Sequence, residues 1–315
     1  MDDLHLIPRF RDALSYLYVE HARIDRHENS IGIWDEEGCV PAPASGLAVL
    51  MLGPGTRVTQ SAITMLADNN CLVIWCGEEN VRFYASGMGG TRSSGSLLHQ
   101  ARLVCDEEKR LGVVRRMYRM RFGPQARGVD EATSVEQLRG MEGARVRDTY
   151  ARMSRETGVP WSGRSYDRGQ WKSADVVNRA LSCANSCLYG VCHAAILSSG
   201  YSPALGFIHT GKQLSFVYDI ADLYKCELTI PLAFRVAGEG EDPPHLERTV
   251  RHRMRDLFRD SKLLQRIIPD IQSALGAPPN EEPSPLDDDP ARPTDLWTPT
   301  APPEPTPQPG DEQWS

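Results

Sequence analysis

The hydrophobic pattern changes near residue 90, and this change constrains the fold more than any other feature of the sequence. Before it, ARIDRHENSIGIW alternates around an Asn-Ser turn, and CLVIWCGEENVRFYAS indicates two strands joined by Gly-Glu-Glu-Asn. After it, apolar residues recur at helical spacing, which predicts helices over 94–123, 134–157, 173–199, 215–238 and 244–275. Strands followed by helices favour an α+β class over alternating β-α units.

Three segments follow from this pattern. We expect a β-rich, sandwich-like domain over residues 1–90 and a larger all-α domain over 91–276. Glycines at 87, 89, 90 and 95 mark the boundary between them. Residues 277–315 contain 12 Pro in 39 residues, a composition that cannot bury a core, so we expect this tail to be disordered.

The formal net charge of −7 conceals a division of charge along the chain. The tail holds nine acidic residues and one Arg, so it carries 1 − 9 = −8, and residues 1–276 carry −7 + 8 = +1. Arg accounts for 30 of the 35 basic residues, and its planar fork suits phosphate oxygens. RLGVVRRMYRMRFG and RTVRHRMRDLFR are the two Arg-rich segments; each is either a nucleic-acid surface or a solvated helix face.

The sequence also bears on compartment. The N-terminus, MDDLHLIPRF, lacks a signal-peptide pattern, and no apolar run approaches the roughly 20 residues of a membrane span, so we expect a cytoplasmic protein. The eight cysteines form no Cys-x-x-Cys pair, which favours reduced, buried thiols over a zinc site.

The segment GFIHTGKQLSFVYDIADLYK, residues 206–225, concentrates polar chemistry among apolar neighbours. Ser215 suits the N-cap of a helix running to Lys225, which would place Asp219 and Asp222 on one face. His209 precedes the helix and could reach the same spot. Alternatively, Asp219 caps or pairs locally and His209 is a satisfied core histidine.

A second unusual carboxylate lies in SVEQLRGMEGARVRDTYARM. Ser134 and Gln137 fit a capping box, and the apolar residues that follow form a stripe that contains Glu142. An ionised carboxylate facing a core is costly unless it is paired or metal-bound. Glu142 is therefore either a metal ligand or the partner of Arg139 or Arg145. Flanking glycines at 140 and 143 would let a backbone or a ligand approach.

Together, Glu142, His209 and Asp222, with Asp219 beside them, supply oxygen and imidazole ligands without thiolate. Such a set suits Mg²⁺ or Mn²⁺. A hard divalent cation next to Arg-rich surface points to phosphodiester chemistry.

Several of these segments, in order, resemble one known family. EQLRGMEGARVR, SCLYGV and GFIHTGKQLSFVYDIADLYK, with LGPGTRVTQSA and NVRFYASGMGG upstream, are similar to the CRISPR-associated adaptation integrase, the "Cas-one" family, in its type I-E (Cascade) subtype. The resemblance runs from about residue 5 to residue 275 and leaves the tail unmatched. It implies an N-terminal β-domain and a C-terminal helical domain.

The resemblance also implies a function. The expected enzyme is a metal-dependent DNA integrase and endonuclease that inserts foreign DNA fragments into a CRISPR array. The 3′-hydroxyl of the fragment attacks a phosphodiester at the repeat, with Glu142, His209 and Asp222 as metal ligands and Asp219 as a further acidic catalytic residue. The implied partners are fragments with 3′ overhangs, CRISPR repeat DNA, a second copy of the chain paired through the β-domain, and a dimer of the small "Cas-two" protein in a 4:2 complex. Whether a host DNA-bending protein takes part is left open.

Expected DNA contacts come from the same resemblance. Arg57 and Arg82 match positions near the DNA backbone, and Lys212, Tyr166 and Tyr189 match positions near the bound strand. His21 stands where relatives place a Tyr that wedges open the duplex end. Two alternatives remain: a stand-alone metal-dependent nuclease acting on DNA in repair, and a non-catalytic DNA-binding scaffold.

Overall fold

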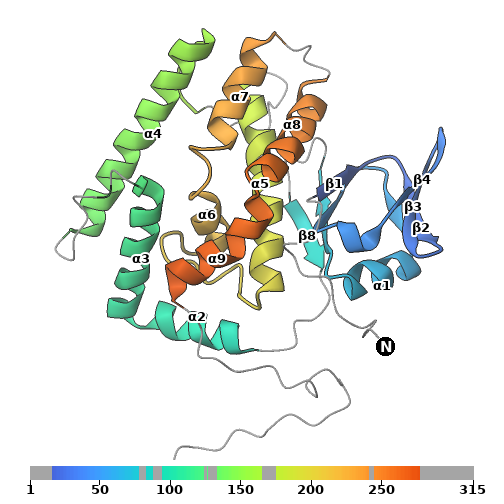
Figure 1. The fold of residues 1–315 in the computed structure, drawn as a ribbon, viewed down its shortest axis with the longest axis horizontal. Helices are drawn as coiled ribbons and strands as arrows, with labels where there is room; N and C mark the ends of the chain where they lie inside the picture. Colours follow the sequence, from blue (N-terminus) through green and yellow to red (C-terminus); the bar gives the residue numbers. More distant parts are fainter. Residues whose placement is uncertain are drawn as a thin grey trace, which may run out of the picture. The chain divides into compact units, whose positions relative to one another are not determined.

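The order of elements follows the change in hydrophobic pattern. The computed structural model describes residues 16–77, 83–87, 94–123, 126, 133–164, 175–240 and 245–276, all within one compact unit that comprises residues 1–281. Up to Gly87 this part of the chain is mainly strand, and from Gly95 onward it is helical (Figure 1). The predicted α+β class is thus confirmed, whereas the domain limits stay a prediction and the tail at 277–315 lies outside the described residues.

Two four-stranded sheets make up the β-rich part. The first has the order β1-β5-β7-β8, parallel except for the β7/β8 pair, and the second has the order β4-β3-β2-β6, in which only β2 and β6 are parallel. The strands are β1 Tyr16–Val19, β2 Arg23–His27, β3 Ser30–Asp35, β4 Gly38–Ala42, β5 Val49–Leu52, β6 Arg57–Val58, β7 Leu72–Cys76 and β8 Phe83–Gly87. The antiparallel pairs β2/β3 and β7/β8 confirm both predicted strand pairs; the turn predicted between β7 and β8 lies outside the described residues.

Strand β5 contributes side chains to two hydrophobic cores. All four of its residues are buried, because successive side chains of a strand point to opposite faces. Leu50 and Leu52 join the core between the sheets, which helix α1 (Gln60–Asp68) also covers. Val49 and Met51 join the larger core formed by the helices. The first sheet is therefore covered on both faces.

Helix α5 (Val176–Ser198) is the central element of the helical part (Figure 1). It packs against four other helices and against β1 and β5, and 16 of its residues are buried. The remaining helices are α2 Gly95–Cys105, α3 Glu107–Phe122, α4 Val135–Thr157, α6 Ser215–Ala221, α7 Thr229–Gly238, α8 Leu246–Asp260 and α9 Leu263–Leu275. A short 3-10 helix, Ala44–Gly46, completes the elements.

One close approach fixes α5 on the sheet. Gly190 faces β5, and a Cβ atom at this position would overlap Cε of Met51 and lie 3.6 Å from Cδ1 of Ile74. Glycine is therefore favoured by packing rather than by its backbone angles, because any larger residue would have to displace the end of the Met51 side chain.

Three of the predicted long helices are each divided in two. Asp106 is extended and caps α3 by accepting a hydrogen bond from the backbone N–H of Lys109, which separates α2 from α3. Lys262 adopts left-handed angles between α8 and α9. The helix predicted over 215–238 is interrupted by a turn between Ala221 and Thr229. Periodicity does not detect these breaks, because the apolar face continues across each of them.

Helix α5 has the length and composition of a membrane span, contrary to the expectation from sequence. However, 78% of its apolar window is buried inside the protein, as in the core helix of a soluble protein. The three cysteines of this helix, Cys183, Cys187 and Cys192, are fully buried, as predicted.

Candidate active site

Glu142 comes from the first half of α4. Ser134 accepts from the N–H of Gln137, whose side chain accepts from the N–H of Ser134, so the predicted capping box fixes where the helix begins. The Glu142 side chain is 17% exposed, and both its oxygens lie within 3.3 Å of Nη1 of Arg145. The alternative ion pair with Arg145 is thus present. The stripe is less buried than expected, because Met141 is exposed.

His209 lies in the loop before α6, and Asp219 holds this loop in place. The fully buried carboxylate of Asp219 accepts hydrogen bonds from the backbone N–H groups of Phe207, Ile208 and His209, at 2.6, 3.1 and 2.9 Å. Its Oδ1 also lies 2.8 Å from Nδ1 of His209. Asp219 therefore touches no solvent, and its contacts indicate a residue that positions His209.

The expectation that Asp219 and Asp222 share one face of a helix is wrong. Helix α6 begins at Ser215 and ends at Ala221, so Ser215 is not the N-cap and the helix does not reach Lys225. Asp222 is the C-cap, and its Oδ1 lies 2.6 Å from Nζ of Lys225 while Oδ2 lies 3.9 Å from Nε2 of His209. Asp219 and Asp222 therefore approach His209 at different ring nitrogens rather than sharing one helix face.

Arg121, at the end of α3, lies among these groups, and sequence reasoning did not single it out. Its Nη1 is 3.5 Å from Oδ2 of Asp222 and 3.9 Å from Oε1 of Glu142, and its side chain is only 2% exposed. Burial would raise the pKa of Asp222, but the charges of Lys225 and Arg121 outweigh it and lower that pKa. The sequence feature that could have pointed to Arg121 is the Arg-rich segment RLGVVRRMYRMRFG, in which this residue lies.

The ligand types suit a hard divalent cation, but their present spacing does not hold one. Among the described residues, no three His, Cys, Asp or Glu side chains lie close enough to bind a metal ion together. His209 and Asp222 approach each other, while Glu142 is drawn toward Arg121 and Arg145. Glu142 and Asp222 both approach Nη1 of Arg121, so a positively charged group already lies between them. Carboxylate oxygens of this kind are also the ligands that a hard divalent cation prefers.

The residues predicted to contact DNA are placed unevenly. Arg57 is exposed on β6, and Lys212 is exposed in the turn after His209. His21 is exposed with a left-handed backbone, beside Gly55. Tyr189 on α5 is half-buried against the site, with Nζ of Lys225 4.9 Å from its ring centre. Arg82 and Tyr166 lie outside the described residues.

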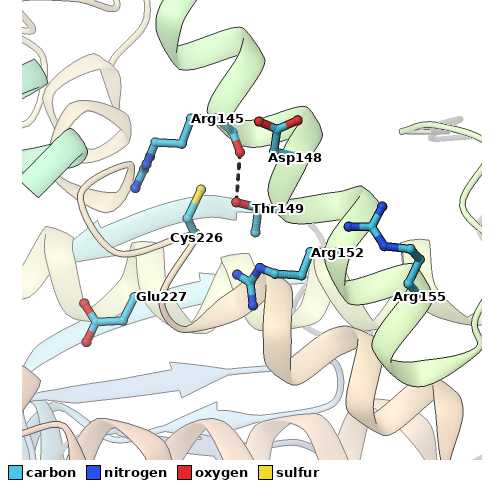
Figure 2. A pocket seen from close by; sticks show the side chains of 7 residues that line it. All are labelled: Arg145, Asp148, Thr149, Arg152, Arg155, Cys226 and Glu227. Atoms are coloured by element: carbon cyan, nitrogen blue, oxygen red, sulfur yellow. Dashed lines mark hydrogen bonds between the residues drawn. The ribbon is translucent and has the colours of Figure 1, made fainter. Parts of the chain in front are cut away.

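A basic pocket of about 460 Å³ adjoins the carboxylate site (Figure 2). Helix α4 contributes Arg145, Asp148, Thr149, Arg152 and Arg155, and the turn after α6 contributes Cys226 and Glu227. Arg145 belongs to both sites, because it lines the pocket and pairs with Glu142. Arg152 pairs with Glu156, whereas in the described part of the chain Arg155 has no ion pair. Three arginines against two acidic side chains favour an anionic ligand.

The glycines beside Glu142 leave open space. A Cβ atom at Gly140 would meet nothing within 4 Å among the described residues, and one at Gly143 would meet only the end of the Arg147 side chain. Of the two expected partners, the described part of the chain brings no second backbone close at Gly140, and on a helix this position faces away from Glu142.

Comparison with known proteins gives the same family as the sequence motifs. Residues 122–245, which contain the carboxylates and His209, match the family model "CRISPR associated protein Cas1". The CRISPR-associated endonuclease Cas1 2 of Thermus thermophilus is 54% identical over 298 residues, 94% of this chain and 90% of that protein. The CRISPR-associated endonuclease Cas1 of Escherichia coli is 45% identical, over 90% of this chain and 92% of its own length. A crystal structure of a TtCas1–DNA complex superposes with a TM-score of 0.78 at 50% identity, covering 91% and 98% of the two chains. The chain belongs to the Cas1 family of CRISPR-associated endonucleases.

Proposed function

We propose that this protein is a metal-dependent DNA integrase and endonuclease of type I-E CRISPR adaptation. The observation that carries the proposal is that Glu142 and Asp222 both face Nη1 of Arg121 and that Asp222 also faces His209, in a chain 54% identical to a Cas1 endonuclease. The substrate is a DNA fragment with 3′ overhangs, and the target is the CRISPR repeat.

Glu142, His209 and Asp222 would hold Mg²⁺ or Mn²⁺. When bound, the cation supplies Lewis-acid activation of the attacking 3′-hydroxyl and neutralises charge on the phosphate. His209 is oriented for this role by Asp219, which occupies Nδ1 and leaves Nε2 on the side of Asp222. Lys225, held 2.6 Å from Asp222, adds positive charge beside the same group.

The basic pocket would hold the DNA backbone next to the reaction. Arg152 and Arg155 project from α4, the helix that carries Glu142, and Arg145 links the two sites. Guanidinium groups bind phosphate oxygens in a planar fork, so a strand lying in this pocket would be fixed close to the carboxylates.

The proposed assembly is a homodimer, two copies of which flank a dimer of the small "Cas-two" partner, in the cytoplasm. The test is joining of a labelled fragment into a supercoiled plasmid that carries a CRISPR repeat, in Mg²⁺ or Mn²⁺. We expect joining by the wild type with the partner and none by Asp222→Asn, while Asp68→Asn, exposed on α1, retains it. Joining by Asp222→Asn at the wild-type rate would reject the site.

A stand-alone nuclease is the second candidate, because the same residues would cleave as well as join. It is favoured by the relatives, which are named CRISPR-associated endonucleases. Comparing cleavage of branched DNA without the partner against plasmid joining with it separates the two functions. Efficient cleavage whose rate the partner does not change would favour the nuclease.

A further inference from the structure

The guanidinium of Arg121 is buried in an unusual way. Its side chain is 2% exposed, yet Nε makes no hydrogen bond with any described residue. Nη2 donates to the backbone oxygen of Asp219 at 3.2 Å, and the guanidinium carbon lies 5.2 Å from the ring centre of Tyr118. Buried guanidinium groups ordinarily use their five N–H donors, because unpaired buried donors are costly.

The contacts of Arg121 with the carboxylates are electrostatic rather than hydrogen-bonded forks. At 3.5 Å from Asp222 and 3.9 Å from Glu142, Nη1 is too far from either oxygen for a good N–H···O bond. By contrast, Lys225 lies 2.6 Å from Asp222. Because Arg121 makes no directed hydrogen bond to these oxygens, its guanidinium can move away from the two carboxylates at low cost.

We propose that Arg121 is a positioning residue that acts as the resident cation of the metal-free site and competes with the divalent cation for Glu142 and Asp222. This inference rests on the proposed function, because it requires a metal at these residues. In the absence of metal, Arg121 compensates two carboxylates that would otherwise repel each other. When a divalent cation binds, it and the Arg121 guanidinium repel each other, and this repulsion is stronger in a partly buried site than in water.

This arrangement predicts that DNA and metal assist each other. A divalent ion beside Arg121, Arg145 and Lys225 adds positive charge to a group of three basic side chains. A DNA phosphate brings the compensating negative charge, so metal affinity should rise when DNA is bound. By linkage, the metal raises DNA affinity by the same factor.

Mn²⁺ titration followed by electron paramagnetic resonance tests this directly on the full-length protein. Arg121→Gln should bind Mn²⁺ at least about tenfold more tightly than the wild type without DNA, since a like charge is removed. The matched control is Arg116→Gln on the same helix, where Nε donates to the backbone oxygen of Ala274. That control also removes one charge and one hydrogen bond to a carbonyl group, and its Mn²⁺ affinity should equal that of the wild type.

Stability of the metal-free protein provides a second readout. Arg121→Gln should melt at a lower temperature in EDTA, because Glu142 and Asp222 lose their shared cation, and Mn²⁺ should restore more stability than in the wild type. If the single variant folds poorly, Arg121→Gln combined with Glu142→Gln should regain melting temperature, because the removed charges balance. Additive losses in the two variants would overturn the inference.

The outcomes separate this inference from the proposed function. Equal Mn²⁺ affinity in wild type and Arg121→Gln, with affinity lost in Asp222→Asn, overturns the role of Arg121 and leaves the metal site intact. Mn²⁺ binding that Asp222→Asn does not weaken overturns the metal site, and the inference with it. The role of Arg121 and the metal site are both supported if Arg121→Gln binds Mn²⁺ more tightly than the wild type does. A DNA oligonucleotide should then raise the Mn²⁺ affinity of this variant by a smaller factor than that of the wild type.

Discussion

Oδ1 of Asp219 lies 2.8 Å from Nδ1 of His209 and 2.9 Å from the backbone nitrogen of the same residue. Asp219 is fully buried, whereas the His209 side chain is 42% exposed, so the carboxylate fixes the imidazole from the protein side. Because a carboxylate acceptor favours a proton on Nδ1, the neutral ring would turn an unprotonated Nε2 toward Asp222. That is the form of histidine that binds a metal ion.

Asp219→Asn tests this relationship. The amide keeps one acceptor oxygen, so its NH₂ faces either the N–H groups of Phe207 and Ile208 or that of His209, and the groups it faces lose their acceptor. We therefore expect a loss of about 2–4 kcal/mol in the free energy of unfolding. Nitrogen NMR of His209 should also show loss of the single Nδ1–H tautomer. The matched control is Asp270→Asn on α9, which accepts one hydrogen bond from Tyr224 and should cost about 1 kcal/mol with the His209 signals unchanged. An unaltered tautomer in Asp219→Asn would contradict the positioning role.

The sequence predicted local features of this site and missed those that depend on tertiary contacts. The capping box of Ser134 and Gln137 follows from four consecutive residues, and it was predicted correctly. The burial of Asp219 depends on a loop folding back over α6, which helical spacing does not reveal. Arg121 meets Asp222 only because the end of α3 lies beside the end of α6, so its role could not be inferred from neighbours in the sequence.

The basic pocket provides a prediction about DNA affinity. Replacing Arg152 and Arg155 by Ala should weaken DNA binding for all sequences and reduce the slope of log affinity against log salt by about 2, because each contact releases about one counterion. Fluorescence anisotropy over a salt series measures both quantities. Arg255→Ala with Arg259→Ala is the control, since both side chains are ion-paired with Asp256 on α8. An equal change in both double variants would show a general charge effect instead of a pocket.

His193 on α5 predicts how stability depends on pH. Burial lowers the pKa of His193 to about 4, from its ordinary value of about 6.5. Between these values the unfolded chain binds a proton that the folded chain does not, so stability falls as pH decreases, by on the order of 3 kcal/mol. Urea unfolding at several pH values should show a shallower fall in His193→Leu than in the wild type. His27→Gln, on β2, should retain the wild-type slope; identical slopes in all three proteins would contradict the prediction.

The charge of the tail gives a prediction that rests on sequence alone. Residues 277–315 carry −8, the same sign as DNA, and would compete with it for Arg-rich surface. A chain ending at Gly276 should therefore bind non-specific DNA more tightly at low salt and with a steeper salt dependence. Trp297 and Trp314 suggest a rival role in binding a partner, which a pull-down with the small partner tests. Unchanged DNA affinity with lost partner binding would reject competition.

The contact between Gly190 and Met51 bears on how such proteins can be recombined. The helices and the first sheet share one hydrophobic core, and a side chain at position 190 on α5 would have to displace the end of the Met51 side chain on β5. A hybrid that joins the β-rich part of one relative to the helices of another inherits only half of this fit. We therefore expect modular exchange at the glycine-rich boundary near residue 90 to cost least stability when positions 51 and 190 are transferred as a pair.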